Sequence, residues 1–116
     1  PLDMAAMNAS KIAHCRNDGN SEILHYLFDN QDKWVKGNTI EELNQNIKKF
    51  IDKSAFKLDV ENCLSNKEVE DHILEDRIEG AKKFKLEATP TLIINGEKFD
   101  NPTNYKKLKK FLEKLI

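Results

Sequence analysis

The chain has 116 residues and a mass of 13.4 kDa, so it is long enough for one domain at most. Its 19 basic and 20 acidic residues give a formal charge of −1. This balance argues against a general nucleic-acid binder, which would carry a basic excess. No apolar run approaches 18 residues, so no membrane span is predicted. The first residue is Pro1 rather than Met, so we expect the native start and any signal peptide to lie outside this chain.

Hydrophobic spacing predicts five helices before any strand, and each begins near a capping residue. The third helix starts at the capping box Thr39-Ile40-Glu41-Glu42, and a second box, Ser65-Asn66-Lys67-Glu68, opens a long fifth helix. A break at residues 16–20 separates the first two helices. The predicted caps of the first, second and fourth helices are Asp3, Ser21 and Asp59. The second helix is predicted to end near Trp34, before Gly37.

The pattern changes at residue 88. Residues 89–94 are β-branched and apolar, and Asn95-Gly96 is the strongest short signal for a hairpin with a type I′ turn. Residues 97–99 form the expected return strand. After a turn and cap at Asn101-Pro102-Thr103, a last helix carries an apolar stripe opposite a lysine-rich face, which we interpret as solvated.

The first predicted strand lacks a partner. Leu92, Ile93 and Ile94 alternate between the faces of a strand, so three apolar residues in a row indicate burial on both faces, as in a central strand. A central strand needs a neighbour on each side, but the sequence offers only residues 97–99. Residues 91–95 should therefore pair with missing strands of the same protein or with a second copy, unless a helix or loop shields the edge.

Two cysteines, Cys15 and Cys63, lie 48 positions apart and form neither a C-x-x-C motif nor a zinc-ligand pattern. Composition leaves two alternatives open: reduced thiols in a cytosolic protein, or one disulfide in an oxidising compartment. Metal binding with His14 or His72 is a remaining minor alternative, although His14 and Cys15 diverge as neighbours on a helix.

The segment Ala88-Thr89-Pro90-Thr91-Leu92-Ile93-Ile94-Asn95-Gly96 resembles the Thr-Pro-Thr hairpin of the DsbA-like thiol:disulfide oxidoreductases, a thioredoxin-fold family. The last helix fits the family's C-terminal helix. Weaker likenesses follow in the right order: Pro1-Leu2-Asp3 with Ala9, Ala13 and Cys15, then residues 27–31 with Trp34, then Cys63-Leu64 with Asp76 and Ala81.

The resemblance implies a partial thioredoxin-like α+β fold, mostly a helical insertion domain followed by a β-hairpin and a C-terminal helix. Residues 1–87 would form the insertion domain and residues 88–116 the β-β-α end of the thioredoxin fold. The family's first strands and its C-x-x-C helix would precede Pro1, so we expect no catalytic residue in this chain. The chemistry requires a low-pKa thiolate with a resolving cysteine two residues later, which Cys15 and Cys63 do not supply.

The family likeness also assigns roles to individual residues. Pro90 would be cis and, with Thr89, would present backbone groups to an extended substrate, as in strand addition. Cys15 and Cys63 would form a structural disulfide in the helical domain. No metal site and no cofactor are expected.

The sequence thus predicts part of a thiol:disulfide oxidoreductase that forms or isomerises disulfides in exported proteins, with this chain alone inactive. Its partners would be unfolded or reduced exported proteins, and its location periplasmic or otherwise exported. The alternative is a standalone helical interaction module that pairs its hairpin edge with a partner or a second copy, as a homodimer.

Overall fold

The computed structural model describes residues 1, 3–16 and 18–116. Leu2, in the N-terminal stretch of the family resemblance, and Asn17, in the break after the first helix, lie outside the described residues. The chain forms two compact units, Pro1–Glu75 and Asp76–Ile116. This boundary reflects where contacts along the chain become sparse, and it falls inside a helix. It does not test the division between residues 87 and 88 that the family likeness implies, so that division stays a prediction.

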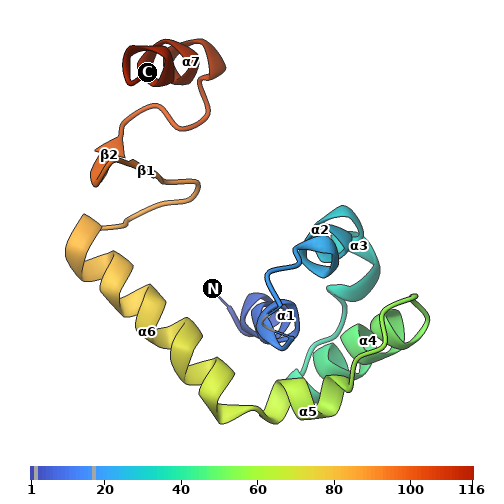
Figure 1. The fold of residues 1–116 in the computed structure, drawn as a ribbon. Helices are drawn as coiled ribbons and strands as arrows, with labels where there is room; N and C mark the ends of the chain where they lie inside the picture. Colours follow the sequence, from blue (N-terminus) through green and yellow to red (C-terminus); the bar gives the residue numbers. More distant parts are fainter. Residues whose placement is uncertain (2, 17) are drawn as a thin grey trace. The chain divides into compact units, whose positions relative to one another are not determined.

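The first unit is helical, as the hydrophobic spacing predicts (Figure 1). Its helices are α1 (Met4–His14), α2 (Glu22–Asp29), α3 (Gln31–Trp34), α4 (Ile40–Asp52), α5 (Val60–Ser65) and the first part of α6 (Lys67–Phe84).

Three of the predicted helix starts are confirmed by side-chain caps. The Ala6 N–H donates to the Asp3 carboxylate at 2.8 Å, and the Glu42 N–H donates to the Thr39 hydroxyl at 3.2 Å. Asp59 accepts from the N–H of the third residue beyond it in the same way. These bonds satisfy N–H groups that have no partner within the helix.

Two other predicted caps are wrong. Ser21 makes no side-chain cap to α2; instead the Glu22 N–H donates to the Asn20 side chain at 2.9 Å. The cap of α6 is Asn66, which accepts from the Val69 N–H, whereas the Ser65 hydroxyl donates back into α5. In both cases an asparagine one position away satisfies the helix start, since Asn and Ser cap about equally well.

The predicted second helix is also divided. Its backbone leaves the helical region at Asn30, with φ −119° and ψ 24°, so α2 and α3 are separate. The Asn30 side chain donates to the Tyr26 carbonyl at 2.9 Å. This bond supplies a partner for a carbonyl at the end of α2, where helical partners run out. Six helices therefore precede the hairpin in the described chain, against the five expected.

The core of the first unit is formed by side chains from α1 to α5. The Trp34 indole N–H donates to the Leu27 carbonyl at 2.8 Å, so its polar group is satisfied while its ring is buried. Tyr26 stacks on Phe50 with ring centroids 4.9 Å apart. The buried members of this cluster are Ile12, Ile23, Leu27, Trp34, Ile47, Ile51, Val60 and Cys63.

One ion pair joins α1 to α6 within this unit. The Lys11 ammonium, in a residue only 6% exposed, lies 2.8 Å from the Glu70 carboxylate and 3.3 Å from the Leu64 carbonyl. The hydrogen bond from Lys11, followed by the attraction of its charge, holds the pKa of Glu70 below its ordinary value. The buried ammonium is thereby paired, as a charge removed from water requires.

The second unit contains the end of α6, a hairpin of β1 (Leu92–Ile94) and β2 (Glu97–Phe99), and α7 (Tyr105–Lys114). The strands pair antiparallel, with Leu92 opposite Phe99 and Ile94 opposite Glu97. Both loop residues have positive φ, 51° at Asn95 and 84° at Gly96, as a type I′ turn requires. The cap of α7 is Asn104, whose side chain accepts from the Lys107 N–H. The cap predicted within residues 101–103 therefore lies one position later.

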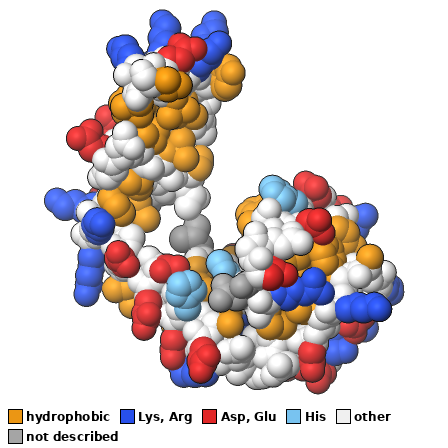
Figure 2. Space-filling view, in the orientation of Figure 1, with side chains coloured by type: hydrophobic (Ala, Val, Ile, Leu, Met, Phe, Trp, Pro, Cys, Tyr) orange, Lys and Arg blue, Asp and Glu red, His pale blue; other side chains and the backbone are white. Residues whose placement is uncertain are grey.

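The hairpin carries less burial than the sequence pattern suggests. All three residues of β1 are half-buried, and β1 and β2 are the whole sheet among the described residues. Phe99 contacts Phe111 of α7, with ring centroids 5.1 Å apart. Figure 2 shows hydrophobic side chains exposed over this unit, and Tyr105 is 74% exposed. In outline the protein is helix-rich with a small antiparallel sheet, consistent with a partial α+β fold.

Candidate functional site

The Thr89-Pro90 loop leads directly into β1. The peptide bond between Thr89 and Pro90 is cis, and both side chains are exposed. The Thr91 hydroxyl donates to the Ala88 carbonyl at 2.6 Å, which closes the loop before the strand begins. The loop therefore presents Thr89 and Pro90 to solvent at the start of the hairpin.

The outer edge of β1 is the second feature of this region. In a hairpin with a two-residue loop, the flanking pair Ile94 and Glu97 exchanges hydrogen bonds, and the next pair turns its backbone groups outward. The N–H and C=O of Ile93 therefore face away from β2. No other strand of the described chain pairs with this edge, so these groups are suited to bind an added strand.

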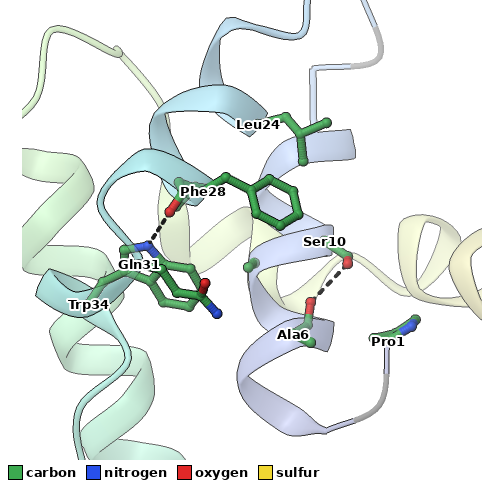
Figure 3. Close-up of a pocket in the computed structure, with 9 residues that line it drawn as sticks. Pro1, Ala6, Ser10, Leu24, Phe28, Gln31 and Trp34 are labelled. Carbon is green, nitrogen blue, oxygen red and sulfur yellow. Dashed lines mark hydrogen bonds between the residues drawn. The ribbon is translucent and has the colours of Figure 1, made fainter. Parts of the chain in front are cut away.

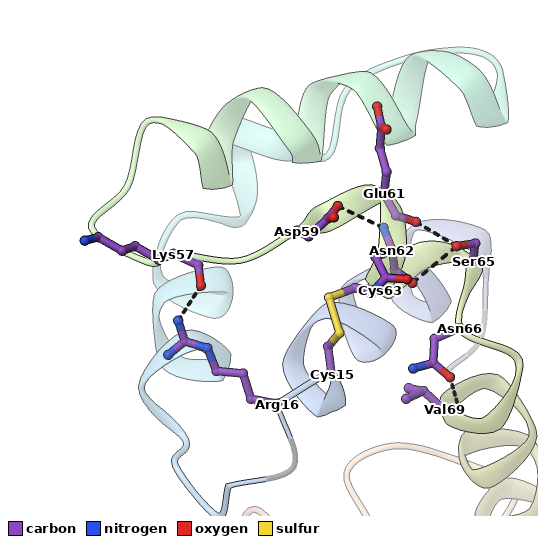
Figure 4. The surroundings of a disulfide bond; sticks show 10 residues. All are labelled: Cys15, Arg16, Lys57, Asp59, Glu61, Asn62, Cys63, Ser65, Asn66 and Val69. Carbon is purple, nitrogen blue, oxygen red and sulfur yellow. Dashed lines mark hydrogen bonds between the residues drawn. A yellow bond between two sulfur atoms is a disulfide. The ribbon is translucent and has the colours of Figure 1, made fainter.

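The cysteines lie in the first unit, and the structure joins them (Figure 4). Cys15, the C-cap residue of α1, bonds to Cys63 in α5 with Cα atoms 5.5 Å apart. Cys63 is 1% exposed, and Arg16 beside the bridge donates to the Lys57 carbonyl at 2.7 Å. The bridge implied by the family likeness is thus present, and neither sulfur is a free thiol.

A mostly apolar groove of about 260 Å³ also lies in the first unit, between α1 and the pair α2 and α3 (Figure 3). Phe28 is 69% exposed beside it. The apolar stripe of the second helix is wider than its buried part, since Ile23 and Leu27 are buried whereas Leu24 and Phe28 are not. Helical periodicity alone does not separate the two faces. The groove is lined by Pro1, Ala6, Ala9, Ser10, Leu24, Leu27, Phe28, Gln31 and Trp34.

The predicted site residues thus fall into two sets, in different units: Cys15 with Cys63, and Thr89 with Pro90. Among the described residues, no helix is long and apolar enough to cross a membrane. In the same part of the chain, no cluster of three or more His, Cys, Asp or Glu side chains could hold a metal ion.

Searches of curated proteins and of solved structures found no match to this chain. A family model described as thioredoxin matches residues 1–114. This match covers nearly all of the chain, from the first helix to the end of α7. The chain therefore belongs to the thioredoxin family.

Proposed function

We propose that this chain is part of a DsbA-like thiol:disulfide oxidoreductase that forms or isomerises disulfides in exported proteins. The carrying observation is the thioredoxin-family match over residues 1–114, in a chain whose Thr89-Pro90 loop leads directly into a hairpin and a last helix. This is the order of elements that the DsbA-like resemblance implies. The membership supports redox chemistry on disulfides, and the substrate class rests on the resemblance.

The role of this chain in the enzyme is to recognise substrate. Thr89 and Pro90 are exposed, and the outward N–H and C=O of Ile93 follow three residues after Pro90. An extended segment of an unfolded protein would bind there through main-chain hydrogen bonds, which do not depend on its sequence. Such binding suits an enzyme with many different substrates.

The redox step requires cysteines other than those present. Cys15 and Cys63 are joined to each other and lie 48 positions apart, so they do not form the closely spaced dithiol that exchange requires. The C-x-x-C would come from a segment outside these 116 residues. A structural disulfide supports an oxidising compartment such as the periplasm, since disulfides persist there and are rare in the cytosol.

The test begins with the coding sequence upstream of Pro1. We expect a C-x-x-C about 30–50 residues before it, as the DsbA-like resemblance implies. The longer protein should then reduce insulin with dithiothreitol as reductant, and the 116-residue chain should not. Turnover by the 116-residue chain, or an upstream sequence without a cysteine pair, would overturn the proposal.

A matched control separates structural from catalytic cysteines in the longer protein. The double variant Cys15→Ser/Cys63→Ser should keep insulin turnover below its unfolding temperature, because these sulfurs take no part in exchange. Serine at the first C-x-x-C cysteine should abolish turnover. Loss of turnover in both variants while both remain folded would show that the bridge belongs to the reaction.

A second candidate rests on a separate observation, the free edge of β1. In this alternative the chain is an interaction module, and the edge pairs with a partner strand or with a second copy. Antiparallel pairing of two β1 strands around Ile93 would give a symmetric dimer. Light scattering across a range of concentrations should then show a dimer, and a strict monomer at high concentration would exclude this pairing.

A further inference from the structure

We propose that Asn95 is a deamidation site, and that opening of the hairpin controls how fast it reacts. Asn95 and Gly96 form the two-residue loop between β1 and β2, and both are exposed. A glycine after an asparagine favours this reaction, because it has no side chain to hinder the approach of its own backbone nitrogen. The reaction requires no enzyme, and neither the family match nor the proposed function assigns it.

The reaction forms a five-membered ring and then opens it. The Gly96 backbone nitrogen loses its proton and attacks the side-chain amide carbon of Asn95; a C–N bond forms, and the side-chain nitrogen leaves as ammonia. Water then opens this succinimide at either carbonyl, which gives aspartate or isoaspartate. One water is consumed and one ammonia is released, so no oxidant or reductant takes part. The product carries one more negative charge at neutral pH.

The folded turn opposes the first step. Asn95 and Gly96 have φ of 51° and 84°, and the geometry of a type I′ turn sets ψ of Asn95 at about +30°. At this ψ the Gly96 nitrogen and the Asn95 side chain lie on opposite sides of the bond between Cα and the backbone carbonyl carbon. The attack therefore requires rotation about that bond, which breaks the turn.

Little in the structure holds this turn closed. β1 and β2 have three residues each and form the whole sheet of the described chain, and a hairpin of two strands is marginal in water. A Cβ at Gly96 would have no atom within 4 Å apart from its chain neighbours, so no other element packs on the loop. The hairpin contacts α7 through Phe99, whose ring centroid lies 5.1 Å from that of Phe111. Opening of the loop breaks few contacts, so the reactive form is accessible.

The structure also ranks Asn95 above a second dipeptide that forms the same ring, Asp18-Gly19. The Asp18 carboxylate accepts the Asn20 N–H at 2.9 Å, which directs it toward a different backbone nitrogen. A carboxylate also resists attack by a nucleophile more than an amide does. The Asn95 side chain has no hydrogen-bond partner in the part of the chain that the structure describes. We therefore expect the hairpin loop to react first.

The isoaspartate product would keep the hairpin open. Its backbone runs through the former side chain and is one carbon longer, so Ile94 and Glu97 would no longer meet in register. The new carboxylate also lies close in sequence to that of Glu97. If the proposed function is correct, the modified chain also loses the β1 edge that binds substrate, whereas the modification itself does not depend on that function.

The experiment is incubation of the 116-residue chain in mildly alkaline buffer, with samples digested by trypsin over several days. Cleavage after Lys85 and Lys98 releases residues 86–98, in which Asn95 is the only asparagine. Mass spectrometry follows the small mass gain as the amide becomes a carboxyl, and chromatography separates aspartate from isoaspartate. The peptide should gain mass in the folded chain, and faster in a chain unfolded by urea, because the turn is then absent.

A pair of variants tests the control by the hairpin. Phe99→Ala removes the contact with α7 but leaves the reacting residues unchanged. It should speed the reaction at least about twofold, the smallest effect expected from the loss of an aromatic pair. Phe56→Ala is the matched control, because Phe56 is also half-buried and contacts a ring, that of Tyr26, but lies in the first unit. It should leave the rate at Asn95 unchanged.

Three results would overturn the proposal. If residues 86–98 gain mass only in urea, the turn does not open in the folded chain. If the folded and the unfolded chains react at the same rate, the turn does not control the reaction. If Phe99→Ala reacts no faster than Phe56→Ala, the contact with α7 does not hold the loop closed. A Phe99→Ala variant whose hairpin is fully open should react at the rate seen in urea, which supports the proposal.

Discussion

The two units of this chain differ in how far they bury apolar side chains. Every buried hydrophobic side chain among the described residues lies in Pro1–Glu75, whereas none of Asp76–Ile116, all of which is described, is buried. The first unit has a core and a disulfide, and the second has a hairpin and a helix with half-buried and exposed apolar side chains. Because an isolated hairpin is marginal in water, the comparison indicates that the first unit is the more stable of the two.

The largest expected effect comes from the disulfide. Replacing both cysteines, Cys15→Ser/Cys63→Ser, should lower the free energy of unfolding of the first unit by about 4 kcal/mol in the chain-entropy model. Urea unfolding followed by circular dichroism measures the loss. The amide resonances of β1 and β2 should not move, because the bridge lies wholly within the other unit. If they lose dispersion together with the core, the two units are not independent.

Core truncation tests the same contrast with one side chain. Ile51 is 0% exposed, so Ile51→Ala should cost about 3 kcal/mol through lost burial and a residual cavity. The matched control is Ile78→Ala in the second unit, where the side chain is 53% exposed. This change should stay within about 0.5 kcal/mol. Equal urea midpoints for the two variants would contradict the assignment of the core to the first unit.

Much of this fold could be predicted from sequence because its signals are local. Thr39 with Glu42 and the Asn95-Gly96 dipeptide each specify geometry within four residues, and the structure follows both. The misplaced caps at Ser21 and Ser65 arise where an adjacent asparagine offers an equivalent side chain, so sequence alone does not rank them.

The candidate sites also divide into features that the sequence predicted and features that it did not. The bridge between Cys15 and Cys63 followed from a family likeness, and the structure contains it. The exposure of Phe28 and the edge-on contact between the rings of His14 and His72 depend on how helices pack across long sequence separations. Periodicity places each of these residues on a helix face but does not say which neighbour that face meets.

In the loop before α4, the backbone at Gly37 lies close to the side chain of Glu42. Gly37 has φ +127°, and a Cβ there would lie 2.7 Å from the Glu42 Cβ. Gly37→Ala should therefore destabilise the unit by roughly 2 kcal/mol, from backbone strain and crowding together. Gly19→Ala is the control, because Gly19 also has positive φ but open space around it, and it should cost about 1 kcal/mol. Equal urea midpoints would show that the loop yields to the added methyl.

The smallest expected effect concerns the ion pair that attaches α6 to α1. Lys11 holds the pKa of Glu70 below its ordinary value of 4.5. A carboxyl whose pKa is lowered by folding stabilises the protein above its unfolded value, and loses this contribution as the pH falls through the folded value. Glu70→Gln should therefore unfold at lower urea than wild type at pH 7. The difference should shrink as the pH falls through the lowered pKa of Glu70, where wild type also loses the charge.

The control for this pair is Glu75→Gln, at an exposed position five residues along the same helix. It should show no such convergence with pH, because no ion pair among the described residues involves Glu75. A gap between wild type and Glu70→Gln that stays constant as the pH falls from 7 through the lowered pKa of Glu70 would mean that the amide disturbs packing rather than charge.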